Sequence, residues 1–572
     1  MFGSSPLRVP VGHDASRWST FRSERTLVVA ARTVTSTVRI LESLPAVLDG
    51  DGRVTVVFAH DPTSAFNAGV LDLLHQAGCR VMPWEQLAEI SPDLILTASE
   101  NIEVPEGDCP VLVLPHGVGF QKQVPDSRST GERLSGVVPD ALLEAGRAWL
   151  AVSHPAQEQQ LLAAHPKTAG HTVLVGDPCL DELLVSRPRR TAYRTAMGLT
   201  AQHRLVLVSS TWGPTSLLGR HPELPARLLA ELPWDEYRVA AVVHPNVWAA
   251  HGAWQLRTVL GDAVPGGLVL VPPVHAWRSA LVAADVVIGD HGSVTLYGAA
   301  AGAPVLLGAF GRDSVAGTAV ADLAARAPRL DPAGDLRGQI EDAVRSHSSL
   351  RYAAVAERAF AAHGQALARL RRVVYHLLRL PEPDAAAPSV RSVPVADPPG
   401  AEVTSWLVTT ALAADDGEPV VGVCRFPAVL GTPAAATETP VRFAHLACAD
   451  DERDSRLTES ASVVLRRRPA DRTVEAVRWI SETLARLPGC LMTAAAVRGG
   501  GVLVGLRDGR MVEAVVTGPP VDAGLPAAVV YACLRGGVDV DGAVVTMRVG
   551  DRGREEDVAL RLRPVPPGEP GP

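Results

Sequence analysis

The chain has 572 residues, of which 47% are hydrophobic and 20% charged, as in globular proteins with sizeable cores, and this length predicts about three or four domains. The net charge of −8 argues against general affinity for nucleic acid. The seven cysteines include no CxxC pair, which argues against a disulfide framework or a zinc ribbon. Residues 1–24 lack the apolar core of a signal peptide, and no apolar run of about 18 residues predicts a membrane span. We therefore expect a cytoplasmic protein.

Residues 25–185 alternate short apolar runs with helical segments, which predicts an N-terminal Rossmann-like domain built on a parallel sheet. The pattern restarts in residues 186–380 and predicts a second such domain. The fold class expected is α/β, with the two domains facing a cleft. Strands are expected at 27–31, 54–59, 79–82, 93–98, 110–114, 149–153, 171–175, 205–209, 238–243, 268–271, 286–288 and 305–307, with helices at 33–48 and 68–77.

Residues 351–380 combine many arginines with an apolar stripe and are expected to form one long helix. The interpretation we favour is that this helix crosses back onto the N-terminal domain. The alternative is that its basic, amphipathic surface lies on an anionic membrane, which would suit a lipid-linked acceptor.

Residues 381–402 are rich in Pro and Ala and predict an extended linker. Residues 403–566 then predict a separate α+β domain of unknown role. It would contain about ten strands, one of them at 528–534, and one clear helix at 473–487.

Polar or Gly-rich clusters follow five of the predicted strands. Because ligands bind beyond the carboxyl ends of strands in open α/β sheets, these clusters are candidate binding residues. Each cluster alone also fits an ordinary turn, and each histidine fits a hydrogen-bonded structural residue. The clusters are Pro115-His116-Gly117, Gly176-Asp177-Pro178, Thr211-Trp212, His244-Pro245 and Asp290-His291-Gly292-Ser293.

The last of these clusters, Asp290 to Ser293, lies between an apolar strand and a helix of small residues. A helix N-terminus carries unpaired N–H groups and the positive end of the helix dipole, so it can bind a phosphate or diphosphate. Gly292 allows an anion to approach the backbone, and Ser293 can cap the helix or donate to an oxygen. The alternative is an ordinary capped turn.

The order of these clusters resembles the CDP-glycerol glycerophosphotransferase family of teichoic-acid synthesis. The resemblance covers residues 100–310 and, more loosely, 25–380. It implies a GT-B fold, which is a pair of Rossmann-like domains facing a cleft. The chain departs from the family at Tyr297, where an acidic residue is usual, and at Gly213-Pro214, where basic residues are frequent. The turn at Asp290 to Ser293 also resembles that of UDP-N-acetylglucosamine 2-epimerases.

The resemblance implies roles for the strand-end residues. His116 would be the general base toward an acceptor hydroxyl, and His244 would contact the leaving phosphates. Thr211, Asp290, Gly292 and Ser293 would bind the donor diphosphate. Gly117, Trp212 and Asp181 would serve the acceptor or a loop; Trp212 alternatively packs in a core, and Asp181 alternatively caps a helix.

Three functions compete. The first is a transferase that moves a glycerophosphate or glycosyl unit from a CDP- or UDP-activated donor to a cell-surface polymer or a small molecule. The second is a UDP-sugar epimerase or hydrolase on the same fold, and the third is a catalytically silent nucleotide-binding or assembly protein. We expect no obligatory metal, because the sequence shows no convincing DxD motif. A lipid-linked acceptor would place the protein at the inner face of the membrane.

Overall fold

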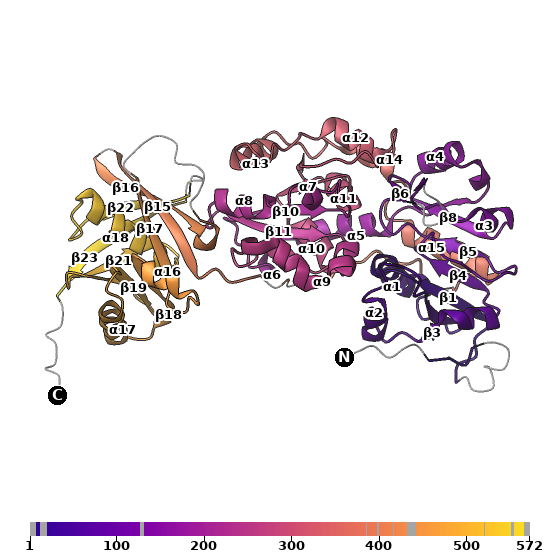
Figure 1. The fold of residues 1–572 in the computed structure, drawn as a ribbon, viewed down its shortest axis with the longest axis horizontal. Helices are drawn as coiled ribbons and strands as arrows, with labels where there is room; N and C mark the ends of the chain where they lie inside the picture. Colours follow the sequence, from indigo (N-terminus) through magenta and orange to yellow (C-terminus); the bar gives the residue numbers. More distant parts are fainter. Residues whose placement is uncertain are drawn as a thin grey trace.

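The computed structural model describes residues 7–11, 20–125, 131–384, 386–396, 398, 400–415, 417–431, 442–519, 521–550 and 554–564. Two α/β parts and a β-barrel follow one another along the longest axis of the molecule (Figure 1). Parts of three predicted segments, 1–24, 381–402 and 403–566, fall outside the described residues. Within the described ranges, no helix has both the length and the apolar character needed to cross a bilayer.

The first part is a seven-stranded parallel sheet in the order β3-β2-β1-β4-β5-β8-β9. Both of its faces are covered. Leu27 and Val29 of β1 pack into a core with α1 and α15, whereas Val28 and Ala30 pack into a second core with α3 and α4. This explains why its strands are apolar at successive positions. The strands are β1 Arg25–Ala31, β2 Val54–His60, β3 Val81–Pro83, β4 Leu94–Thr97, β5 Val111–Val113, β8 Ala148–Val152 and β9 Thr172–Leu174; the helices are α1 Val34–Leu48, α2 Val70–Gln76, α3 Asp140–Glu144 and α4 Pro155–Ala164.

The second part is a five-stranded parallel sheet in the order β12-β11-β10-β13-β14, also covered on both faces. Every strand predicted between residues 25 and 310 is present. The sequence did not predict a small two-stranded antiparallel sheet, which lies between β5 and β8 in the chain. It consists of β6 Gln123–Pro125 and β7 Glu132–Leu134. The strands of the second sheet are β10 Arg204–Ser210, β11 Tyr237–Val243, β12 Val269–Val271, β13 Val286–Gly289 and β14 Val305–Leu307; its helices are α5 Pro178–Ser186, α6 Arg190–Ala196, α7 Leu217–Arg220, α8 Leu224–Glu231, α9 Pro245–Leu260, α10 Ala276–Ala283, α11 Ser293–Ala300, α12 Ala319–Arg326 and α13 Leu336–Arg345.

The single helix predicted for residues 351–380 is wrong. Two helices, α14 (Ala353–Ala359) and α15 (Ala366–Leu378), are separated by a break in which Ala362 and Gly364 have φ of 56° and 73°. A right-handed helix cannot contain such left-handed residues. The apolar side chains of α15 are buried in the core of the first sheet, so this face is covered by protein rather than available to a membrane.

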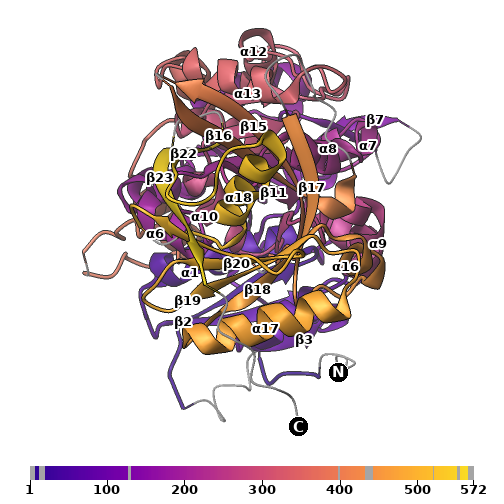
Figure 2. The same cartoon turned by 90° about the vertical axis from the view of Figure 1, so that its left-hand side faces the viewer.

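The C-terminal part is a closed barrel in the order β15-β16-β22-β23-β21-β20-β19-β18-β17. The predicted strand at 528–534 is wrong, because these residues belong to helix α18 (Gly524–Gly536), which lies inside the ring of strands (Figure 2). A short run that is apolar on every side fits a buried strand and a buried helix equally well. The helix predicted at 473–487 is α17 (Thr473–Arg486), which packs outside the barrel near α16 (Ser455–Ser460). The strands are β15 Ser405–Asp415, β16 Glu418–Pro427, β17 Arg442–Ala449, β18 Val463–Ala470, β19 Met492–Val497, β20 Val502–Leu506, β21 Met511–Val516, β22 Val544–Val549 and β23 Arg554–Arg563.

Candidate functional site

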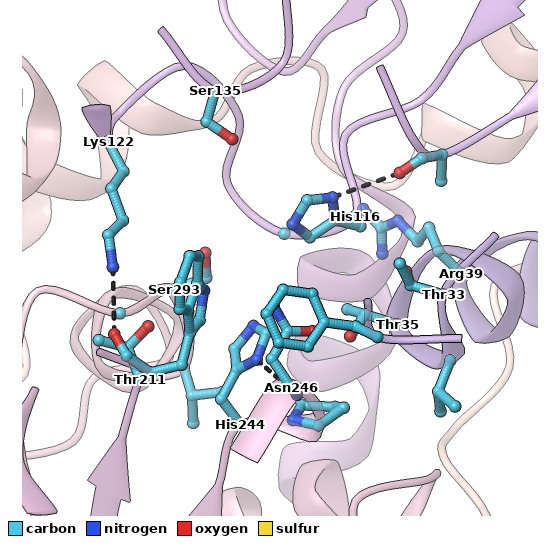
Figure 3. A pocket seen from close by; sticks show the side chains of 18 of the residues that line it. Thr33, Thr35, Arg39, His116, Lys122, Ser135, Thr211, His244, Asn246 and Ser293 are labelled. Carbon is cyan, nitrogen blue, oxygen red and sulfur yellow. Dashed lines mark hydrogen bonds between the residues drawn. The ribbon is translucent and has the colours of Figure 1, made fainter. Parts of the chain in front are cut away.

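A cavity of about 620 Å³ lies between the two parallel sheets. Loops at the carboxyl ends of β1, β4 and β5 form one wall, and loops after β10, β11 and β13 form the other (Figure 3). Its volume falls within the range of small-molecule sites. Seven of the nine residues predicted for the site line it: His116, Gly117, Thr211, Trp212, His244, Gly292 and Ser293.

His116 lies on the wall contributed by the first sheet. Its Nδ1 is 3.3 Å from the carbonyl oxygen of Ala98. Because a carbonyl oxygen only accepts hydrogen bonds, this contact requires the proton on Nδ1 and leaves a lone pair on Nε2. The side chain in this tautomer can accept a proton from a ligand in the cavity.

His244 lies on the opposite wall (Figure 3). Its Nδ1 accepts a hydrogen bond of 3.1 Å from the N–H of Asn246, and the side chain thereby caps the N-terminus of α9. The ring proton is therefore on Nε2. Burial, with smaller contributions from His116 and Lys122, lowers the pKa of His244 to about 3. At neutral pH His244 is an uncharged hydrogen-bond donor.

Asp290 does not line the cavity, although the sequence placed it among the donor-binding residues. It is 1% exposed, and burial raises the pKa of its carboxyl group. The carboxylate accepts hydrogen bonds from the N–H groups of Thr211, Leu217 and Gly292 at 2.9, 2.8 and 2.9 Å. Asp290 thus joins the loop after β10 to the turn after β13. It holds the backbone of the cavity wall in place without contacting the cavity.

The two walls touch where Gly117 meets Ser293. The N–H of Val118 donates to Ser293 Oγ at 3.1 Å, and a Cβ atom at position 117 would lie 2.6 Å from the same oxygen. Glycine is therefore the residue that permits this approach. Ser293 begins α11, whose first N–H groups have no partner within the helix and point toward the helix start.

Trp212 lies on the cavity wall rather than in a core. Its ring is 5.7 Å from that of Phe66 and 4.8 Å from Lys122 Nζ, both from the first domain. Lys122 Nζ also lies 3.0 Å from Asp313. Neither Phe66 nor Lys122 was predicted from the sequence. A signal was present for the second, since Lys122 is one of only two lysines in a chain whose other 52 basic residues are arginine.

Asp181 lies away from the cavity, and it fixes a loop. Its carboxylate accepts hydrogen bonds from Gly364 N–H at 2.6 Å and Ala366 N–H at 3.2 Å, in the segment that leads into α15. The alternative prediction, a helix cap, is wrong, because Asp177 caps α5 by accepting from Leu180 N–H at 3.0 Å.

Tyr297 occupies the position where the acidic residue was expected. It is 2% exposed, its hydroxyl donates to Asp177 at 2.7 Å, and burial raises its pKa. Asp177 in turn lies 3.1 Å from Arg39 of α1. The tyrosine therefore connects α11 to the segment between the domains.

The cations that line the cavity all have carboxylate partners. As a result the walls carry little net positive charge toward a ligand. The pairs are Arg32 with Asp61, Arg39 with Asp177, Lys122 with Asp313, and Arg133 with Glu100. Across the part of the chain that the structure describes, no cluster of three or more His, Cys, Asp or Glu side chains is arranged to hold a metal ion.

No family model and no curated protein matches the chain. Solved structures similar to it include the wall teichoic acid polymerase TagF, at 12% identity and a TM-score of 0.44, over 63% of this chain and 90% of that one. They also include UDP-GlcNAc 2-epimerases from Neisseria meningitidis (11%, 0.38, 62% and 99%) and Methanocaldococcus jannaschii (12%, 0.39, 61% and 99%). A teichoic-acid polymerase and 2-epimerases are also the two kinds of protein that the strand-end clusters resemble.

Proposed function

We propose that the protein is a GT-B transferase that moves a glycerophosphate or glycosyl unit from a nucleotide-diphosphate donor to an acceptor hydroxyl. One observation carries the proposal: His116 and His244 line the same cavity from opposite sheets, and their Nδ1 contacts leave Nε2 of His116 able to accept a proton and Nε2–H of His244 able to donate one. In this scheme residues 25–185 bind the acceptor and residues 186–380 bind the donor.

The proposed chemistry needs two kinds of group. The acceptor hydroxyl must lose a proton, and the departing phosphate must be stabilised as negative charge develops on it. His116 is the proton acceptor, because its Nε2 can take the proton from the hydroxyl. The departing phosphate is stabilised by His244 Nε2–H and by the first N–H groups of α11. Thr211 and Ser293 add hydroxyl groups to the same wall. The scheme needs no metal.

A second candidate function is nucleotide binding without turnover. The observation that favours it is the pairing of each cation on the cavity wall with a carboxylate. A donor with two phosphates carries negative charge that such walls offset only in part. In this case His244 and α11 would still hold the nucleotide, and His116 would be dispensable.

Isothermal titration calorimetry with CDP, UDP, CMP and CDP-glycerol tests the proposal. We expect the diphosphates to bind more tightly than CMP, because the α11 N-terminus and His244 act on the phosphates. Ser293→Ala should weaken this binding. Ser481→Ala, on the outer barrel helix α17, is the matched control and should leave it unchanged.

Nucleotides that all fail to bind would contradict the proposal. If a nucleotide binds, the donor that gives turnover with an acceptor decides between glycerophosphate and glycosyl transfer. His116→Ala then separates the two candidate functions, because it should abolish transfer while nucleotide binding persists. Turnover that survives His116→Ala would remove the general-base role.

A further inference from the structure

Glu100 and His116 each lie three residues beyond the end of a strand, and the two strands are neighbours in the sheet. In the parallel pair of β4 and β5, Thr97 lies opposite Val113, and three residues further along each chain come Glu100 and His116. The Ala98–His116 hydrogen bond of 3.3 Å shows that the two segments stay side by side beyond the strands. The sheet thus brings the two segments together, and both Glu100 and His116 line the cavity between the sheets.

Glu100 is a buried, charged side chain. It is 8% exposed, and its Oε1 accepts hydrogen bonds of 3.1 Å from both Nη1 and Nη2 of Arg133. Burial acts to raise the pKa of Glu100, but His116 and Arg133, together with the backbone N–H groups of Glu100 and Gly136, outweigh it, and the pKa is lowered. A carboxylate stabilised by a neighbouring histidine cation stabilises that cation in return, since the interaction is reciprocal.

Glu100 and His116 also share two cavities. Both line the main cavity, and both line a smaller one of about 40 Å³ behind it, together with Ser135 and Ser293. The smaller cavity has room for a water molecule and has polar groups to bind one. The carboxylate can therefore act on the imidazole through space or through a hydrogen-bonded water.

We propose that Glu100 is a positioning residue that stabilises the protonated form of His116. This inference rests on the proposed function for its meaning in catalysis, where His116 accepts the acceptor proton through Nε2. Glu100 remains ionised, paired with Arg133, and the imidazolium that forms is stabilised by its charge.

The other charged groups near His116 act in the opposite direction or not at all. His244 is neutral at physiological pH, and Lys122 is a cation already paired with Asp313. Arg133 is a cation that Glu100 offsets. Removing the carboxylate thus leaves the Arg133 cation near His116 without its partner, which disfavours the protonated imidazole.

The test is an NMR titration of the histidine Cε1–H signals in the full chain without nucleotide. The His116 signal is assigned by its disappearance in His116→Gln. In Glu100→Gln we expect the midpoint of the His116 titration to move by about one pH unit toward acid. Glu103→Gln, an exposed carboxylate in the same segment, is the matched control and should leave the midpoint in place.

Two further variants keep the test decisive if Glu100→Gln folds poorly. Glu100→Asp keeps the charge and should restore most of the midpoint, whereas Arg133→Met removes the cation and should move the midpoint toward higher pH. An unchanged midpoint in Glu100→Gln would overturn the inference. Because the titration needs neither donor nor acceptor, the result is independent of whether the protein proves to be a transferase.

Discussion

Two His-Pro turns in the chain have the same local structure and different surroundings. His154 follows β8 and His244 follows β11, and each accepts a hydrogen bond through Nδ1 from the N–H two residues later, at 3.0 and 3.1 Å. Each thereby caps the helix that follows, α4 or α9. Only His244 is among the cavity-lining residues described. The His-Pro turn is thus a helix cap in both places. Only the turn at His244 also lies opposite His116, and only this turn is a candidate for function.

The largest expected difference between the two turns is in nucleotide binding. Asparagine is a good N-cap, so His244→Asn should preserve the start of α9 while removing the Nε2–H from the cavity. We expect nucleotide-diphosphate affinity to fall about tenfold to a hundredfold, as for the loss of a hydrogen bond to a charged group. Calorimetry on the variant measures the change.

His154→Asn makes the same replacement in the turn that does not line the cavity. It should leave the affinity within about twofold of the original protein, and circular dichroism should show both variants folded. Equal losses in the two variants would mean that the caps act on stability alone, and the distinction between the turns would fail.

The second difference is in the dependence of stability on pH. The pKa of His244 is about 3 in the folded chain and about 6.5 when unfolded, so between these values the unfolded chain binds the proton. Acid therefore destabilises the fold as the pH drops below about 6.5. Relative to the original protein, His244→Asn should lose about 2 kcal/mol less stability between pH 7 and pH 5. Urea unfolding at the two pH values measures this.

Burial also lowers the pKa of His154, helped by Arg358. His154→Asn should accordingly change the pH dependence in the same direction but less. A pH dependence that neither variant alters would show that other groups dominate acid unfolding.

The smallest expected effect concerns the contact that holds the two walls together. A methyl group at position 117 would crowd Ser293 Oγ, and the backbone at Gly117 is not left-handed, so Gly117→Ala tests the steric contact alone. We expect a loss of about 1 kcal/mol in stability and a severalfold loss of nucleotide affinity. Gly117→Ala combined with Ser293→Gly should be less destabilised than the sum of the two single changes, as a thermal-unfolding cycle would show.

The strands of both parallel sheets were predictable because they are buried on two faces and read as short apolar runs. The strand-end residues followed from the rule that ligands bind beyond the carboxyl ends, and seven of the nine line one cavity. Asp290 was misplaced because a polar residue beside a cavity can face the backbone instead, and sequence spacing does not give that direction. Of the two roles predicted for Asp181, the acceptor or a loop, the structure shows the loop. Glu100 was missed because its proximity to His116 depends on strand register across the sheet, which a single sequence does not show.

The errors in helices have a different origin. The break between α14 and α15 depends on left-handed residues at Ala362 and Gly364, and an alanine there carries no sequence signal. Helix α18 was taken for a strand because its residues are apolar all round, and only the enclosing barrel distinguishes the two.

The position of α18 has a consequence for how the protein is made. Strands β22 and β23, the last two of the barrel, fill the gap between β16 and β21, and they follow α18 in the sequence. During synthesis the helix therefore leaves the ribosome before its enclosure is complete, with an apolar surface exposed to other chains. A nonsense mutation between α18 and β22 removes no residue of either parallel sheet, and we expect the truncated chain to be prone to aggregation and degradation. Changes that abolish this protein's function therefore need not lie near its cavity.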